Sequence, residues 1–314
     1  MLNIQRVLFP TDLSDGSKRA FAQAAHFAHW HEAALHVLNV TGRHAHDYEE
    51  TKSRFPLSAE TLTDWLGAPS HPEAAADRPD FEAMPVVQEQ IESAHPPESI
   101  VDYAEAQDVD LIVMGTHGRR GVERLLVGSV TEEVVRAAPC PVLTIRSPVH
   151  ARPDEAMRRI LVPVDFSEAS AAAVLHAKEI ALTYGAEIDL IHVVEEAVYP
   201  SAYGVEPVSI PTQEIIERVE SSLAEMVRED IGHEHVMVKG VVGYAPRTIL
   251  DRAEETGADL IVIATHGRTG LDRVLLGSVT ERVLRQSPTP VFVVKPGQKS
   301  LVTAGAANEA STAE

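Results

Sequence analysis

The chain has 314 residues, of which 44% are hydrophobic and 24% are charged, a balance typical of a soluble globular protein with about two domains. Its 47 acidic residues outnumber 27 basic ones, and the formal net charge of -20 disfavours nucleic acid and anionic membranes as partners. The aromatic content of 5% argues against a stacking platform for single-stranded nucleic acid.

Cys140 is the only cysteine, so the chain can form no intrachain disulfide. We expect it to be a small buried hydrophobic residue near a strand. Residues 1–12 contain a short strand-like run in place of a basic leader followed by an apolar stretch, and no segment approaches about 18 consecutive apolar residues. These features predict a cytoplasmic protein that does not enter the membrane.

In the first half of the chain, we expect one strand to end at Asp12 and a second strand to end at Val40. The stretch 41–85 is rich in Pro, His, Ala and Glu, and only residues 58–66 have a helical pattern. This composition predicts a partly irregular crossover between the second and third strands. The third strand is expected around residues 86–93.

A glycine-containing segment follows the fourth strand: Gly115, Gly118, Gly128 and Ser129 have the spacing G-x2-G-x9-G-S, and the fourth helix begins where it ends. Ligands of open parallel sheets lie outside the carboxyl ends of the strands, and a helix amino terminus presents unpaired N–H groups to an anion. We therefore interpret the segment as a phosphate-binding loop. A structural turn is the alternative, because glycines also occur in turns that bind nothing.

The second half alternates apolar runs with helical patterns. Five runs rich in Val and Ile predict buried strands at 160–164, 188–194, 236–242, 260–264 and 291–294. Four helices are predicted between them, at 169–184, 211–231, 246–256 and 278–286. This alternation specifies a parallel sheet with right-handed crossovers and helices on both faces.

The two halves are copies of one another. Residues 115–146 align without gaps on residues 264–295 with 17 of 32 positions identical, and VLFPTDLSDGS near the start matches ILVPVDFSEAS in the second half. After the last strand the sequence is small, polar and aperiodic, which predicts disorder. The expected units are a nucleotide-binding domain at 1–147, a linker at 148–158, a second such domain at 159–296 and a disordered tail at 297–314.

The turns PTD and PVD place Asp12 and Asp165 at the carboxyl ends of the first strands, beside the point where the strand order reverses. A carboxylate there suits a ribose hydroxyl or a metal ion. The alternative is a helix cap, a role for which Ser14 and Ser167 compete. Where the second strands end, Val40 and Val193 are expected to line a pocket for the adenine ring; the alternative is that they are ordinary strand residues.

The phosphate-loop pattern recurs in register in the second half, where Ala264 replaces the leading glycine. An added methyl there could block a close approach of the backbone to phosphate. Four loop arginines are either phosphate contacts or solvated side chains: Arg119, Arg124, Arg268 and Arg273.

The PTD and PVD turns, the ends of the second strands, and the segments GTHGRRGVERLLVGSVTE and ATHGRTGLDRVLLGSVTE resemble the universal stress protein family, over nearly the whole chain as a tandem pair. The resemblance implies an α/β fold with two tandem open parallel five-stranded sheets of order 3-2-1-4-5 and helices on both faces. It also implies ATP, or AMP or ADP, as ligand, and a regulatory role in the stress response. Family members dimerise through their last strands, which implies that residues 142–146 and 291–295 pair within this chain as a pseudo-dimer.

The resemblance assigns two sets of nucleotide-binding residues. The first set is Asp12, Val40, Gly115, Gly118, Gly128, Ser129, Val130 and Thr131. The second set is Asp165, Val193, Gly267, Gly277, Ser278, Val279 and Thr280. Aligning IVDYA with ILDRA places Ala94 where the second half has Gly243, the residue type favoured by the family after the third strand. Each site thus has one imperfect position, so we expect unequal occupancy.

The sequence contains neither a G-x4-G-K-[ST] loop nor a G-x-G-x-x-G motif after the first strand, which favours nucleotide binding without dedicated catalysis. His117 and His266 are candidates for proton transfer or phosphate contact, or they organise their loops. Slow ATP hydrolysis and a nucleotide-independent interaction module remain the alternatives, and a further homodimer and a regulatory protein partner are open.

Two H-x-H pairs without further ligands disfavour zinc, and we expect Mg²⁺ to be held mainly by bound phosphates. These pairs are His44 with His46 and His233 with His235.

Overall fold

The computed structural model describes residues 2–42, 54–68, 78–116, 128–146, 157–195, 212–228, 235–265 and 276–302. The first half contains β1 (Arg6–Thr11), α1 (Asp15–Trp30), β2 (Ala34–Thr41), α3 (Ala59–Leu66), β3 (Val86–Glu92), α4 (Pro96–Ala106), β4 (Leu111–Gly115), α5 (Ser129–Ala137) and β5 (Val142–Ile145). The second half contains β6 (Arg159–Pro163), α6 (Glu168–Tyr184), β7 (Glu187–Val194), α7 (Thr212–Met226), β8 (Val236–Val242), α8 (Ala245–Thr256), β9 (Leu260–Ala264), α9 (Ser278–Gln286) and β10 (Val291–Val294).

All strands belong to one ten-stranded sheet of order β3-β2-β1-β4-β5-β10-β9-β6-β7-β8. Each half has the predicted order 3-2-1-4-5, and its strands pair in parallel. The two halves meet through an antiparallel pair in which Phe292 of β10 lies opposite Leu143 of β5. The predicted fold and strand pairing are therefore confirmed. Because β5 pairs with β10, the two expected sheets form one mixed sheet, and neither of these strands is left as an exposed edge.

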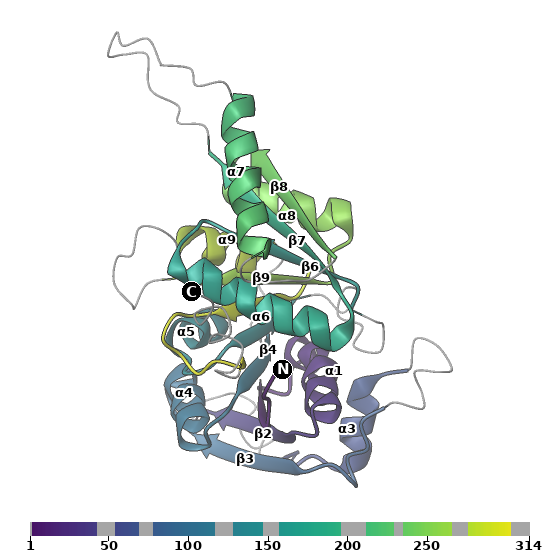
Figure 1. The fold of residues 1–314 in the computed structure, drawn as a ribbon. Helices are drawn as coiled ribbons and strands as arrows, with labels where there is room; N and C mark the ends of the chain where they lie inside the picture. Colours follow the sequence, from purple (N-terminus) through teal and green to yellow (C-terminus); the bar gives the residue numbers. More distant parts are fainter. Residues whose placement is uncertain are drawn as a thin grey trace.

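Helices cover both faces of the sheet, as the apolar strands require (Figure 1). One buried cluster lies under α1, α3, α6 and α7, and includes Phe21, Leu62, Ala173 and Leu223. The other lies under α4, α5, α8 and α9. Cys140 is fully buried beside β5, as predicted, and burial raises the pKa of its thiol to about 12. The thiol is therefore protonated and unreactive near neutral pH.

The helices α1 and α6 meet near the centre of the molecule, at the junction of the two halves (Figure 1). Their carboxyl ends pack through aromatic rings: the ring of Tyr184 lies 6.0 Å from that of Phe27 and 5.6 Å from that of Trp30. The Tyr184 hydroxyl lies 3.2 Å from Nε2 of His31. This contact adds a second surface to the pseudo-dimer, which the strand pattern alone did not indicate.

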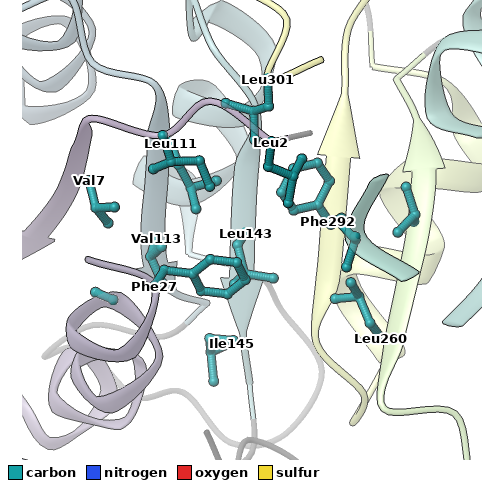
Figure 2. Packing of buried hydrophobic residues seen from close by; sticks show 14 of the residues in the cluster. Leu2, Val7, Phe27, Leu111, Val113, Leu143, Ile145, Leu260, Phe292 and Leu301 are labelled. Atoms are coloured by element: carbon teal, nitrogen blue, oxygen red, sulfur yellow. The ribbon is translucent and has the colours of Figure 1, made fainter. Parts of the chain in front are cut away.

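The tail differs from its predicted disorder over residues 297–302. Leu301 is buried beside Leu2 and Phe292 (Figure 2), and its N–H donates to Nε2 of His176 on α6 at 3.3 Å. An isolated bridge pairs Leu2 with Val302. We call residues 297–302 the C-terminal strap, because they leave the second half and pack against both halves.

Candidate functional site

The site begins at the turn between β1 and α1. Oδ1 of Asp12 accepts hydrogen bonds from the N–H of Ser14 at 3.0 Å and from its hydroxyl at 2.5 Å. The Ser14 oxygen in turn accepts from the N–H of Ser17 at 3.2 Å and so caps α1. The cap is therefore the serine, and the aspartate fixes the turn that carries it.

The same arrangement recurs in the second half. Oδ1 of Asp165 accepts from the N–H and the hydroxyl of Ser167 at 3.1 and 2.5 Å, and Ser167 caps α6. The residues that follow the two aspartates, Leu13 and Phe166, both have positive φ angles, 63° and 61°. Such a conformation costs a non-glycine residue on the order of 1–3 kcal/mol and is concentrated at functional sites. Its presence in both copies indicates that the turn is held in one geometry.

Gly115, at the end of β4, has a structural role that the motif did not reveal. A Cβ added to Gly115 would lie 2.5 Å from the carbonyl oxygen of Gly16 in the first turn of α1. The leading glycine is therefore required by the close approach of α1 to β4, whether or not a phosphate is bound. The structure thus gives the leading glycine a packing role in the first half, and the effect of the Ala264 methyl on phosphate in the second half stays a prediction.

We expect Gly115→Ala to lower the free energy of unfolding by about 1–3 kcal/mol, because backbone atoms must move to admit the methyl group. The displaced α1 would also weaken nucleotide binding in the first half. Urea unfolding and ATP titration measure the two effects. Gly42→Ala is the control, since the nearest atom to its added Cβ, the carbonyl oxygen of Ser93, lies 3.8 Å away. Equal stability of the two variants would refute the packing explanation.

The helices α5 and α9 start at equivalent glycines. The N–H of Gly128 donates to the carbonyl of Thr116 at 2.6 Å, and that of Gly277 donates to Thr265 at 2.7 Å. One turn further, the hydroxyl of Thr131 donates to the carbonyl of Gly115 at 2.9 Å. The pair Thr280 and Ala264 repeats this bond at 2.6 Å. The threonines thus anchor both helices to the strand ends, so their hydroxyl protons already have acceptors.

The amino termini of α5 and α9 have no side-chain cap among the described residues. Unlike α1 and α6, which serines cap, these helices start at glycines and have no hydrogen bond from a capping side chain. Ser129 and Ser278, the first residues of the two helices, are exposed. First-turn N–H groups lack intrahelical acceptors, so each terminus offers donors and the positive end of a helix dipole.

Apolar side chains at the ends of β2 and β7 and at the starts of α5 and α9 pack against one buried cluster. Val40 pairs in register with Ile91 and packs, like Val130 of α5, against the cluster under α4 and α5. Val193 and Val279 occupy the same positions in the second half. The structure thus places Asp12, the end of β2 and the start of α5 at the carboxyl edge of one half-sheet, and their counterparts at that edge of the other half.

One buried polar residue at this edge, Asn39, was not predicted from the sequence. The Asn39 side chain is completely buried, donates through Nδ2 to the carbonyl of Thr11 at 2.8 Å and accepts from Gln90 at 2.8 Å. In the second half, Nδ1 of His192 lies 2.7 Å from the carbonyl oxygen of Val164. These side chains hold the ends of the first two strands together. A single polar residue inside an apolar strand, as in VLNV, was the available signal.

The structure corrects the alignment after the third strand. The N–H of Gly243 donates to the carbonyl of Val194 at 3.1 Å, and the N–H of Ser93 makes the same bond to Thr41 at 2.9 Å. Ser93 is therefore the counterpart of Gly243, and Ala94 is an additional residue before α4. A Cβ at Gly243 would lie 2.5 Å from Oγ1 of Thr248, so this glycine also has a packing role.

Several predicted residues lie outside the described part of the chain. These are Gly118, Gly267, His117, His266, Arg119, Arg124, Arg268, Arg273, His44, His46 and His233. Within the described ranges, no group of three or more His, Cys, Asp or Glu side chains could hold a metal ion. Over the same ranges, no helix is long and apolar enough to cross a membrane.

Comparison with known proteins connects this architecture to one family. The model of the universal stress protein family matches the chain twice, over residues 3–146 and 157–295. A universal stress protein of Methanocaldococcus jannaschii is 33% identical over 156 residues, which cover 44% of this chain and 94% of that protein. One of Mycobacterium tuberculosis is 31% identical over 196 residues, covering 60% of this chain and 63% of that protein.

A solved structure reproduces the tandem arrangement. The crystal structure of a universal stress protein from Archaeoglobus fulgidus aligns with 93% of this chain and 98% of its own, with a TM-score of 0.63 and 24% sequence identity. At this identity the likeness shows the fold.

Proposed function

The chain belongs to the universal stress protein family, a family of stress-response proteins, and on this basis we propose that each of its halves binds an adenine nucleotide. ATP is the proposed ligand, with AMP and ADP as close variants. The observation that carries the proposal is a pair of helices, α5 and α9, that begin at a glycine–serine pair beside the carboxyl ends of β4 and β9 and that no side chain of the described ranges caps. A helix start of this kind is suited to phosphate.

In the proposed complex, the phosphates lie at the first-turn N–H groups of α5, with the Ser129 hydroxyl as a further donor. The Asp12 carboxylate faces the ribose, and Val40 and Val130 contact the adenine. Asp165, Val193, Ser278 and Val279 have these roles in the second half. Mg²⁺ would be bound mainly by the phosphates, since it retains several waters and takes few protein ligands.

The proposed role is regulatory: a cytoplasmic protein whose nucleotide occupancy is recognised by a partner protein. The proposal includes no catalytic step, because the chemistry that it draws on is the binding of an anion and an apolar ring. The stress signal and the partner would then act on the equilibrium between occupied and empty halves.

Titration with ATP in a calorimeter, with and without Mg²⁺, tests the proposal. The wild-type chain is expected to bind two equivalents, and Ser129→Trp and Ser278→Trp are each expected to lose one, because an indole at the first helical position blocks the N–H groups. Ala137→Trp, an exposed change at the other end of α5, is the control and should retain both. Absence of binding heat in the wild-type chain, with no nucleotide released from the purified protein, would refute the proposal.

A further inference from the structure

The two phosphate-binding helices are linked across the interface between the halves by one arginine. Nη2 of Arg285 on α9 lies 3.1 Å from Oε2 of Glu132 on α5 and 2.7 Å from Oε1 of Glu281 on its own helix. A single guanidinium nitrogen is therefore shared by two carboxylates, one from each half. All three side chains are only partly exposed, between 23% and 35%.

Both carboxylates occupy the first turn of a phosphate-binding helix. A negative charge in the first turn is attracted by the helix dipole, but it repels any phosphate bound at the same terminus. A nearby guanidinium reduces this repulsion. The position of the Arg285 side chain between Glu132 and Glu281 should therefore influence the phosphate affinity of both sites.

The two carboxylates are not equally supplied with positive charge. Glu132 also pairs with Arg136 of its own helix at 3.4 Å. In the described part of the chain, Glu281 pairs with Arg285 alone. The second site consequently depends on the shared arginine more than the first site does.

Two further hydrogen bonds join the carboxyl ends of these helices to the opposite half. Nη1 of Arg146 donates to the carbonyl of Arg285 at 2.5 Å, and Nζ of Lys295 donates to the carbonyl of Arg136 at 3.3 Å. These bonds cross between the halves and hold the carboxyl ends of α9 and α5. Both carboxylates share the Arg285 guanidinium, so the position of this side chain is the variable that can link the two sites.

We propose that Arg285 couples the two nucleotide sites with negative cooperativity. Phosphate bound at α5 adds negative charge beside Glu132, which attracts the Arg285 guanidinium more strongly toward Glu132 and away from Glu281. Glu281 then repels phosphate more strongly, and phosphate binding at α9 is weakened. By thermodynamic linkage, occupancy of the second site weakens the first by the same factor. This inference rests on the proposed function and adds a mechanism for unequal occupancy.

Calorimetric titration with ATP measures the coupling. Ser129→Trp and Ser278→Trp isolate the two sites and give two single-site association constants. In the wild-type chain, the overall constant for filling both sites is expected to be about fivefold smaller than the product of these constants, a factor that corresponds to about 1 kcal/mol. Raising NaCl from about 0.1 to 1 M should bring the ratio toward one, because the screening length falls from about 10 to 3 Å.

Substitutions at Arg285 test its role. Arg285→Gln, combined with the same blocking changes, is expected to make the overall association constant equal to the product of the two single-site constants. Arg285→Lys should restore part of the difference between them. Arg136→Gln is the matched control, because this substitution removes the other partner of Glu132 and leaves the shared arginine in place.

A ratio of one in the wild-type chain would overturn the coupling while the binding function stands. A salt-independent ratio, or one unchanged by Arg285→Gln, would overturn the role of Arg285, and absence of ATP binding in every chain would overturn both proposals.

Discussion

Replacing Arg252 with methionine is expected to lower the free energy of unfolding by about 3–5 kcal/mol. Arg252, on α8, donates through Nε to Oδ2 of Asp189 at 2.8 Å, and the Asp189 side chain on β7 is 0% exposed. Methionine preserves much of the volume of the arginine stem but leaves the buried carboxylate without its counter-charge. Removal of one partner from a buried ion pair costs far more than the pair contributes, because the remaining charge stays desolvated.

The first half provides the matched control. At the equivalent positions, Nδ1 of His36 lies 2.9 Å from the hydroxyl of Tyr103, so a neutral pair replaces the ion pair. Tyr103→Phe removes one hydrogen bond between neutral groups and is expected to cost about 1 kcal/mol. Urea unfolding monitored by circular dichroism compares the two variants.

The double variant Asp189→Asn with Arg252→Met should recover much of the lost stability, because no buried charge then remains. If Arg252→Met lowered the free energy of unfolding no more than Tyr103→Phe, another group would neutralise the Asp189 carboxylate. The claim that Asp189 depends on Arg252 would then be wrong.

Deletion of the C-terminal strap is the second change with a large expected effect. A chain that ends at Pro296 should lose about 3 kcal/mol of unfolding free energy, most of it from Leu301, which is 1% exposed and whose removal uncovers Leu2. Urea unfolding measures this loss. A chain that ends at Val302 keeps every described strap contact and should retain the stability of the full chain.

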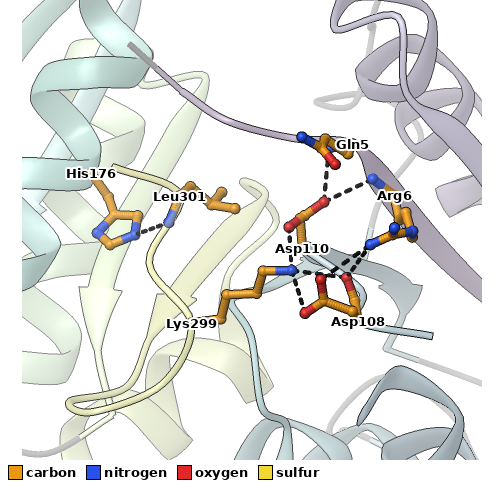
Figure 3. A network of polar contacts seen from close by, with 7 residues as sticks. All are labelled: Gln5, Arg6, Asp108, Asp110, His176, Lys299 and Leu301. Carbon is orange, nitrogen blue, oxygen red and sulfur yellow. Dashed lines mark hydrogen bonds and ion pairs between the residues drawn. The ribbon is translucent and has the colours of Figure 1, made fainter. Parts of the chain in front are cut away.

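Lys299, the charged residue of the strap, makes a separate contribution to the free energy of unfolding (Figure 3). Nζ of Lys299 lies 2.7 Å from Oδ1 of Asp108 and 2.7 Å from Oδ1 of Asp110. Burial alone would lower the pKa of Lys299, but its bonds to the two aspartates raise the pKa above its ordinary value. Asp110 is also held by the N–H groups of Gln5 and Arg6 at 2.7 and 2.8 Å.

Lys299→Met and Leu301→Ala separate the two contributions of the strap. The leucine change is expected to be the larger, at about 2–3 kcal/mol, and the lysine change about 1 kcal/mol, because the ammonium is partly exposed. Wild-type stability in the chain ending at Pro296 would mean that the strap does not hold the two halves together.

Strand positions and topology were predictable because buried parallel strands are continuous apolar runs, and because the duplication gave two independent views of each element. The pairing of β5 with β10 followed from the family resemblance. Helix starts at Ser58 and Ser278 were also correct to within one residue, since the serine and glycine signals are local.

The features that the sequence did not reveal are tertiary. The strap contains one large apolar residue, Leu301, and its burial depends on Leu2 and His176, which are far away in the sequence. Gly115 matches a phosphate-loop glycine in the sequence, and its additional packing role arises from Gly16, which lies on another element. The counterpart of Gly243 was placed at Ala94 because the helix alignment was extended across a one-residue difference in the preceding loop.

A crystal structure of the protein grown with ATP tests the central claim most directly. The account predicts a nucleotide in at least the first half, with phosphate oxygens within hydrogen-bonding distance of the N–H groups of residues 129–131, and the equivalent contacts at residues 278–280 wherever the second half is occupied. The ribose should face Asp12, and the adenine should contact Val40. A nucleotide bound away from the starts of both α5 and α9 would contradict the account.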